Sequence, residues 1–156
     1  DGETYILPLE VTEAIYGIQV DQFAFNTAEG GEGKYRGGRG LIRDYRILSD
    51  QGGFVTATFG RHKYTPWGVA GGRNGSPNAV QILFADGRPP VTFGKTARFP
   101  LKKGDVVRLI TGSGGGWGDP RERDRDLVLA DLRADLITED IARRIYGLTD
   151  ADLARL

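Results

Sequence analysis

The placement of glycine constrains this 156-residue chain more than any other feature. The chain has 24 glycines, about twice the roughly 7% share that is usual in soluble proteins. Sixteen of them fall within residues 30–40, 60–75 and 112–118. Glycine lets main chains approach one another closely because it has no Cβ. We therefore expect these stretches to form close-packed, extended segments resembling polyproline II.

Short runs rich in β-branched and aromatic residues separate the glycine stretches, and turn sequences stand between them. Strands are predicted over Thr4–Val11, Ile18–Asn26, Leu41–Leu48, Phe54–Phe59, Ala79–Ala85, Pro90–Phe93 and Asp105–Thr111. A slip in the hydrophobic alternation of the second run predicts a β-bulge near Asp21–Gln22. The expected fold class is mainly β, with two sheets in a sandwich- or barrel-like arrangement.

Residues 119–156 have helical periodicity instead. Asp119, Pro120 and Glu122 form a helix-start sequence. An apolar stripe at helical spacing follows, made of Val128, Leu129, Leu132 and Leu136. Further helices are predicted from Thr138 towards Gly147, and from Thr149. The sequence thus divides into a β domain with glycine-rich strands (1–118) and a short helical C-terminal tail (119–156).

Composition excludes several classes of function. The chain has no cysteine, which rules out disulfides and cysteine-based zinc sites. The 21 Lys and Arg balance the 21 Asp and Glu, so net charge gives no reason to expect a polyanionic partner. No apolar run reaches the length of a membrane span. Because the chain also lacks methionine, we expect a subunit without its first residues or a piece of a longer polypeptide.

The segment Gly112–Gly118 follows a predicted strand and precedes a predicted helix, which is the setting of a phosphate-binding loop. A nucleotide loop of this kind ends in Gly-Lys-Ser/Thr, whereas here Gly118 is followed by Asp119 and Pro120. The Asp would repel phosphate and the Pro removes an N–H donor. We therefore expect close main-chain packing, and no cofactor bound by this chain.

Residues 30–40, followed by Arg43 and Arg46, superficially resemble an RNA-binding Arg-Gly-Gly segment. The segment occurs once, lies between two predicted strands and belongs to a neutral chain. These facts favour a glycine-built turn whose arginines pair with neighbouring acidic residues, and no nucleic-acid partner.

Catalytic candidates are few. His62 is the single histidine, and it stands between Arg61 and Lys63. One histidine cannot form a multi-histidine metal site. It could act as a general base, but no nucleophile or orienting carboxylate lies near it in the sequence. Arg61, His62 and Lys63 are thus weak catalytic candidates. We expect no metal site and no complete active site on this chain.

Taken together, the segments form a more specific pattern than any one of them. In order, they are Pro8–Val11, Gly30–Arg46, Pro66–Arg73, Lys103–Arg108, Gly114–Pro120 and Asp131–Gly147. This order resembles the C-terminal portion of the hydantoinase B/oxoprolinase family over nearly the whole chain. The resemblance implies an ATP-dependent enzyme that acts on poorly reactive carbonyl compounds. In such enzymes, a partner subunit phosphorylates a cyclic amide or enolisable ketone, and the hydantoinase B part completes ring opening or carboxylation.

At 156 residues the chain resembles a small subunit of an acetophenone carboxylase. The resemblance implies conversion of acetophenone and bicarbonate to benzoylacetate, with a mainly structural role for this chain. It further implies a cytoplasmic hetero-oligomer with a large hydantoinase B-like subunit and hydantoinase A-like ATP-binding subunits. ATP and a divalent metal such as Mg²⁺ would be bound by those partners. Two alternatives remain open: part of an ATP-dependent hydantoinase, oxoprolinase or lactamase, and a free-standing β module that binds RNA or saccharide.

Residues of the glycine clusters and their neighbours are expected to serve packing and interfaces rather than catalysis. These are Gly31, Gly33, Arg36, Gly37, Gly38, Arg43, Trp67, Gly71, Gly72, Gly114, Gly115, Gly116 and Trp117.

Overall fold

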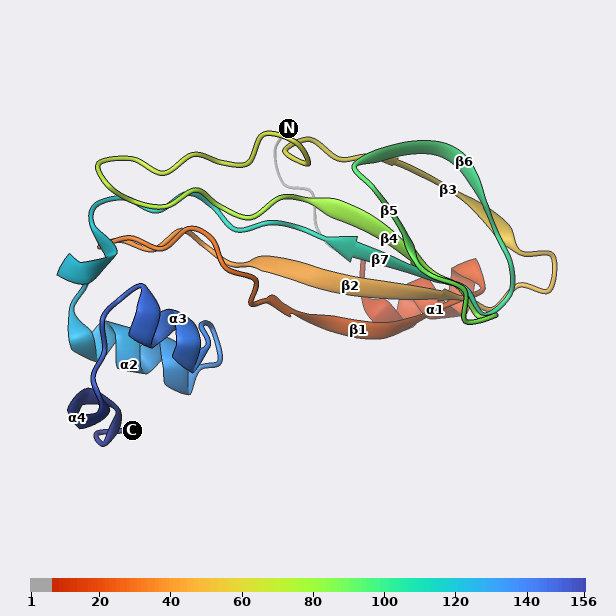
Figure 1. Ribbon diagram of the computed structural model, residues 1–156. Helices are drawn as coiled ribbons and strands as arrows, with labels where there is room; N and C mark the ends of the chain where they lie inside the picture. Colours follow the sequence, from red (N-terminus) through yellow and green to blue (C-terminus); the bar gives the residue numbers. More distant parts are fainter. Residues whose placement is uncertain (1–6) are drawn as a thin grey trace.

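A computed structural model of the protein describes residues 7–156. Two β-sheets occupy one end of an elongated molecule, the glycine-rich segments extend from them, and the helical tail lies against the far end (Figure 1). The elements are α1 (Leu9–Tyr16), β1 (Ile18–Asn26), β2 (Gly40–Ile47), β3 (Gly53–Thr58), β4 (Ala79–Leu83), β5 (Val91–Phe93), β6 (Lys95–Leu101), β7 (Val106–Ile110), the 3₁₀ turn η1 (Pro120–Glu122), α2 (Arg125–Arg133), α3 (Glu139–Arg144) and α4 (Asp150–Leu153).

The strands form two antiparallel sheets. The larger sheet has the order β1-β2-β7-β4-β5, and the smaller one pairs β3 with β6. Only Gly94 separates β5 from β6, so the chain passes from one sheet to the other at this corner. The prediction of a mainly β fold with two sheets and a helical tail is confirmed. Within residues 7–156, neither sheet closes into a barrel.

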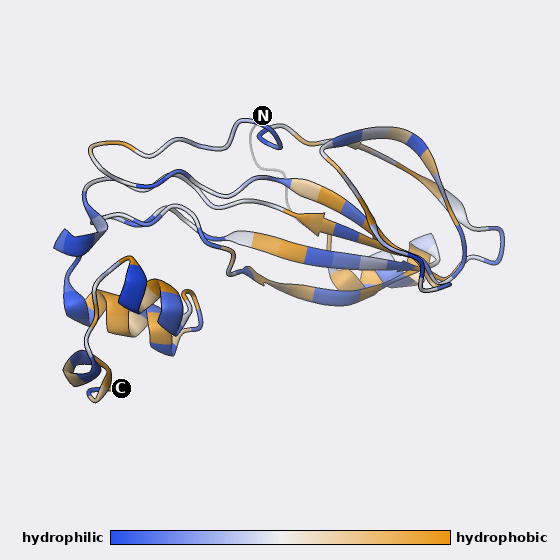
Figure 2. Ribbon diagram, viewed as in Figure 1, coloured by the Kyte–Doolittle hydropathy of each residue, from blue (hydrophilic) through white to orange (hydrophobic). Residues whose placement is uncertain are grey.

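The sheet core lies between the two layers. It consists of Ile47, Ala57, Val80, Ile82, Leu101 and Val107. Aromatic side chains complete it, with the rings of Phe93 and Phe99 centred 5.2 Å apart. Figure 2 shows hydrophobic residues in the strands and in the tail helices, whereas the glycine-rich connections are mostly pale. Apolar burial therefore holds the two ends of the molecule, and main-chain packing must hold the part between them.

The bulge predicted near Asp21–Gln22 is confirmed. The pairing of β1 with β2 shifts register between Val20 and Gln22. Burial along β1 nevertheless alternates without a shift, and the side chains of Phe23 and Phe25 are 45% and 58% exposed.

Two strand predictions were wrong. The described part of the predicted strand Thr4–Val11 enters helix α1 at Leu9, and residues 4–6 lie outside the described residues. Pro8 starts this helix, since its fixed φ suits a helix N-terminus. Gly17 ends the helix in a left-handed conformation.

Strand β6 was not predicted, because Lys95, Ala97, Arg98 and Pro100 interrupt its apolar pattern.

The tail differs from its prediction at the first helix. The Asp119 carboxylate does accept a hydrogen bond from the Arg121 N–H, yet the turn it caps is only η1. Helix α2 begins after a second cap, Asp124. The predicted stripe therefore ends early, because Leu136 lies beyond the helix. Helices α3 and α4 start at the predicted caps, Thr138 and Thr149.

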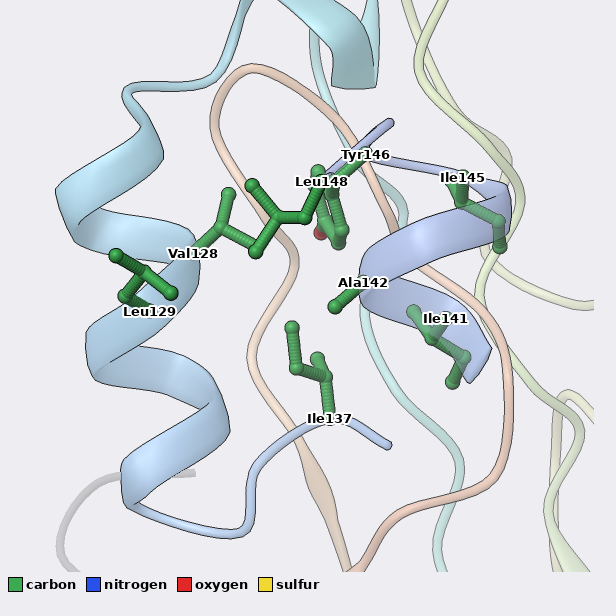
Figure 3. Packing of buried hydrophobic residues seen from close by; sticks show 8 residues of the cluster. All are labelled: Val128, Leu129, Ile137, Ile141, Ala142, Ile145, Tyr146 and Leu148. Atoms are coloured by element: carbon green, nitrogen blue, oxygen red, sulfur yellow. The ribbon is translucent and has the colours of Figure 1, made fainter. Parts of the chain in front are cut away.

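The tail has a hydrophobic core of its own. Val128 of α2 points towards α3 (Figure 3), and Leu129, Ile141 and Ala142 belong to the same buried cluster, which residues of the adjoining loops complete. No helix within residues 7–156 is both long enough and apolar enough to cross a bilayer.

Candidate functional site

The three glycine stretches lie side by side and hydrogen-bond to one another through their main chains. The Tyr35 and Trp117 amides each donate to the carbonyl of the other, at 2.9 Å in both directions. The Val69 N–H donates to the Gly116 carbonyl at 2.9 Å, and the Arg73 N–H donates to the Glu32 carbonyl at 2.7 Å. Each stretch thus bonds to the other two. We call this arrangement, within residues 30–40, 66–76 and 112–118, the glycine core.

Main-chain proximity explains why glycine is needed there. At six glycines, an added Cβ would overlap a carbonyl group of a neighbouring stretch. These glycines are Gly31, Gly33, Gly37, Gly72, Gly115 and Gly116. Main-chain atoms cannot move aside as side chains can. Gly71 has a positive φ of 92° instead, and Gly38 is exposed with nothing near its would-be Cβ. The glycines that were predicted to serve packing therefore differ in what requires glycine. Some make a close main-chain contact, Gly71 has a positive φ, and Gly38 has neither constraint.

Large aromatic side chains project from the glycine core into solvent. Tyr35, Trp67 and Trp117 are 64%, 68% and 50% exposed, and Val69 is exposed beside them. The Tyr35 and Trp117 rings are centred 5.6 Å apart. We call these four residues the aromatic edge. Exposed Trp and Tyr on a fixed main chain are typical of protein interfaces, where they supply most of the binding energy.

A buried ionic cluster joins the glycine core to the tail. Arg36 donates two hydrogen bonds, each 3.0 Å long, to both carboxylate oxygens of Asp131 in α2. Arg123 donates a third at 2.9 Å. Glu32 is fully buried, accepts a hydrogen bond from the Gly30 N–H and lies 3.4 Å from the Arg73 Nε. The Arg36–Asp131 pair therefore attaches the tail to the core, whereas the Arg123–Asp131 pair lies within the tail and the Glu32–Arg73 pair lies within the core.

The surface beside this cluster is polar. A hollow of about 480 Å³ is lined by Glu29, Gly30, Arg73 and Asn74. Arg144 of the tail donates a 2.6 Å hydrogen bond to Glu29, which holds the pKa of that carboxyl below its usual range. Burial raises the pKa of the nearby Tyr146 phenol. The Arg144–Glu29 pair crosses the junction between the tail and the rest of the chain, whereas the Tyr146 hydroxyl has no hydrogen-bond partner among the described residues.

The three weak catalytic candidates lie on an exposed loop after β3. The His62 Nδ1–H donates to the Phe59 carbonyl at 2.9 Å. Arg61 stacks on the Trp67 ring at 5.2 Å, and Lys63 lies over Tyr64. Among residues 7–156, none of the three candidates forms an ion pair with a carboxylate. The structure therefore places them against aromatic rings and main chain, and a catalytic role for them stays a prediction.

Two arginines of this region were predicted to serve packing, Arg36 and Arg43. The Arg43 guanidinium lies 5.0 Å from the ring centroids of both Phe23 and Tyr45. Other features of the site were not predicted from the sequence. Asp131 belongs to a segment of the family resemblance, but its pairing with Arg36 was not predicted, because the two residues are 95 positions apart. Tyr35 could have been found, since an aromatic residue inside a glycine cluster has little apolar core to join.

The fold and this site define a β protein with a rigid glycine core and an uncovered aromatic edge. The family model described as Hydantoinase B/oxoprolinase matches residues 1–120. The chain belongs to that family.

The chain is similar over most of its length to two further proteins, and two solved structures share its fold. The chain is 37% identical to the uncharacterized protein MJ0963 of Methanocaldococcus jannaschii over 89% of its length, and 33% identical to the B subunit of a putative D-/L-hydantoinase from a Pseudomonas species over 93%. It covers 24% of each relative. An ATP-dependent caprolactamase from Pseudomonas jessenii shares the fold (TM-score 0.66, 24% identity, 92% of this chain and 26% of that one). So does an acetone carboxylase (TM-score 0.74, 19% identity, 98% and 26%).

Proposed function

We propose that this chain is a structural component of an ATP-dependent hydantoinase-family complex. In this role it packs against a large hydantoinase B-like polypeptide, beside hydantoinase A-like subunits that bind ATP and a divalent metal such as Mg²⁺. The aromatic edge carries the proposal, because Tyr35, Trp67 and Trp117 are largely exposed on a main chain that is hydrogen-bonded between the three glycine stretches. The chain also spans only about a quarter of the relatives it matches, so a larger polypeptide is available to cover that edge.

The reaction we propose for the complex is carboxylation of acetophenone by bicarbonate to benzoylacetate. On the partner subunits, ATP phosphorylates bicarbonate and the oxygen of the ketone, whose α-carbon loses a proton to give the enol phosphate. The α-carbon forms a bond to the carbon of carboxyphosphate, phosphate leaves from that carbon, and water takes the second phosphoryl group from the enol oxygen. The shared fold with an acetone carboxylase supports a ketone substrate. The contribution of this chain is to hold the partners in a fixed geometry, which favours a reaction between two activated species.

Hydrolysis of a cyclic amide is the second candidate. The names of two similar proteins favour it, the putative D-/L-hydantoinase and the ATP-dependent caprolactamase. In this reaction, water replaces bicarbonate as the second reactant, and the amide C–N bond of the ring breaks. The proposed role of this chain is the same in both reactions.

Assay of the purified complex separates the two reactions. ATP turnover that requires both acetophenone and bicarbonate is the result expected for carboxylation. Turnover with hydantoin, 5-oxoproline or caprolactam in the absence of bicarbonate would establish hydrolysis and refute the carboxylase proposal. A chain that stays monomeric when co-expressed with hydantoinase A- and B-like partners would contradict the structural role itself.

Replacement of Trp117 by Ala should weaken assembly while leaving ATP binding intact. Truncation of an interface Trp typically costs about 2 kcal/mol or more, so we expect at least about a 30-fold rise in the Kd for the large subunit. The matched control is Leu127→Ala, because Leu127 of α2 is exposed to a similar extent but lies away from the aromatic edge. Affinity measured by biolayer interferometry and ATP binding measured by calorimetry give the two readouts. Lost ATP binding in an intact complex would instead indicate a nucleotide role for the glycine core.

A further inference from the structure

The two sheets of the sandwich differ in width. Five strands face two, so the smaller sheet leaves part of the larger one uncovered. Strand β3 (Gly53–Thr58) pairs with β6 on one side. Within residues 7–156, its other side has no partner strand. An unpaired strand edge is a template for a further strand, because its N–H and C=O groups remain available.

An apolar groove runs beside this unpaired edge. Its volume is about 500 Å³. The floor is formed by Ile18 and by side chains of β2 and β7, and the wall is formed by residues of β3, including Val55, and by Phe59, which follows that strand. On the adjoining positions of β3, Phe54, Thr56 and Thr58 are exposed. The groove thus continues the sheet core towards solvent.

We propose that a β-strand of the large hydantoinase B-like polypeptide pairs with β3 and fills this groove. In a strand, alternate side chains point to the same face. A segment with apolar residues at alternate positions could therefore pair its main chain with β3 and place those side chains against Ile18 and Tyr45. This is strand addition, in which the main chain gives affinity and the pockets give specificity.

Chain length supports this occupant, and this step rests on the proposed function. Because the chain covers 24% of the hydantoinase relative, about three quarters of such a polypeptide lies outside the matched region. That remainder can supply a strand. A small apolar ligand could fill the groove but would leave the main-chain groups of β3 unpaired.

Charge favours a partner over a second copy of this chain. Strands β3 and β6 carry two basic residues, Lys95 and Arg98, and no acidic residue. The Arg98 guanidinium lies 4.7 Å from the ring of Phe54, at the side of the groove. Pairing β3 with another β3 would bring two basic surfaces together, and like charges oppose association. We therefore expect acidic residues to flank the incoming strand.

A pair of neutral substitutions tests the groove. Val55→Gln places an amide on the groove side of β3, and Thr92→Gln places the same amide on the exposed side of β5, at a residue that does not line the groove. We expect Val55→Gln to raise the Kd for the large subunit at least 10-fold, and Thr92→Gln to change it less than about threefold. Equal affinities for the two variants would refute the proposal.

Hydrogen exchange of the unmodified chain gives a second readout, which does not depend on how the variants fold. Complex formation should slow exchange of the outward-pointing amides of β3. A complex that forms without protection of β3 would overturn the groove proposal and leave the proposed function standing. If no complex forms, the proposed function fails and the groove proposal with it. Protection that appears in the isolated chain on raising its concentration, or on adding acetophenone, would overturn the proposal by assigning the groove to a second copy or to a small ligand.

Discussion

Alanine at Gly37 is expected to destabilise the protein severely, whereas alanine at the adjacent Gly38 is expected to be tolerated. A Cβ at Gly37 would overlap the carbonyl groups of Gly114 and Gly115, and nothing lies within 4 Å of a Cβ at Gly38. When an added Cβ overlaps main-chain atoms, no change of side-chain rotamer can relieve the overlap. We therefore expect a loss of about 3 kcal/mol in the free energy of unfolding for Gly37→Ala.

The Gly38→Ala variant is the matched control, because it adds the same methyl group one residue away. Gly38 is exposed and does not have a positive φ. A compatible Gly-to-Ala change alters stability by about 1 kcal/mol or less, often favourably. Chemical denaturation followed by tryptophan fluorescence measures both variants. Similar stabilities for the two would show that the glycine core can rearrange, and would remove the reason given for a fixed aromatic edge.

How far the sequence predicts this fold depends on how local each signal is. The glycine clusters predict close main-chain packing because the cause, a missing Cβ, belongs to the residue itself. The bulge after Val20 is visible as a slip in alternation. Strand β6 is not visible, because it is held by its pairing with β3 some 40 positions earlier. Helix α1 was predicted as a strand because its first residues belong to a short, mainly apolar run. Pro8 and Gly17, which set the ends of the helix, are the sequence signals that favour the helix instead.

The candidate site shows the same limit. Trp67 and Trp117 could be singled out from their glycine-rich surroundings, but their exposure is a property of the folded chain. The partnership of Arg36 with Asp131 and the groove beside β3 depend on segments that meet only after folding. Sequence therefore indicated which residues matter for packing, and the structure indicates which surfaces remain to be covered.

Replacement of Asp131 by Asn is expected to release the tail from the glycine core. The Asp131 carboxylate is buried and accepts three hydrogen bonds from Arg36 and Arg123, whose side chains are also largely buried. An Asn keeps the shape but leaves two buried guanidinium groups without a countercharge. Breaking a buried ion pair in this way costs about 3–5 kcal/mol. The tail has its own hydrophobic core, so we expect detachment with the helices retained.

Asp126→Asn provides the comparison on the same helix. Asp126 is exposed and pairs with Arg155, and such surface pairs contribute about 0–1 kcal/mol. Limited proteolysis should therefore cut Asp131→Asn rapidly between Asp119 and Asp124 and spare Asp126→Asn, while circular dichroism reports similar helix content for both. Resistance of the Asp131→Asn variant would mean that apolar contacts, not the buried charges, attach the tail. In that case, the orientation of the aromatic edge relative to α2 would not depend on the ionic cluster.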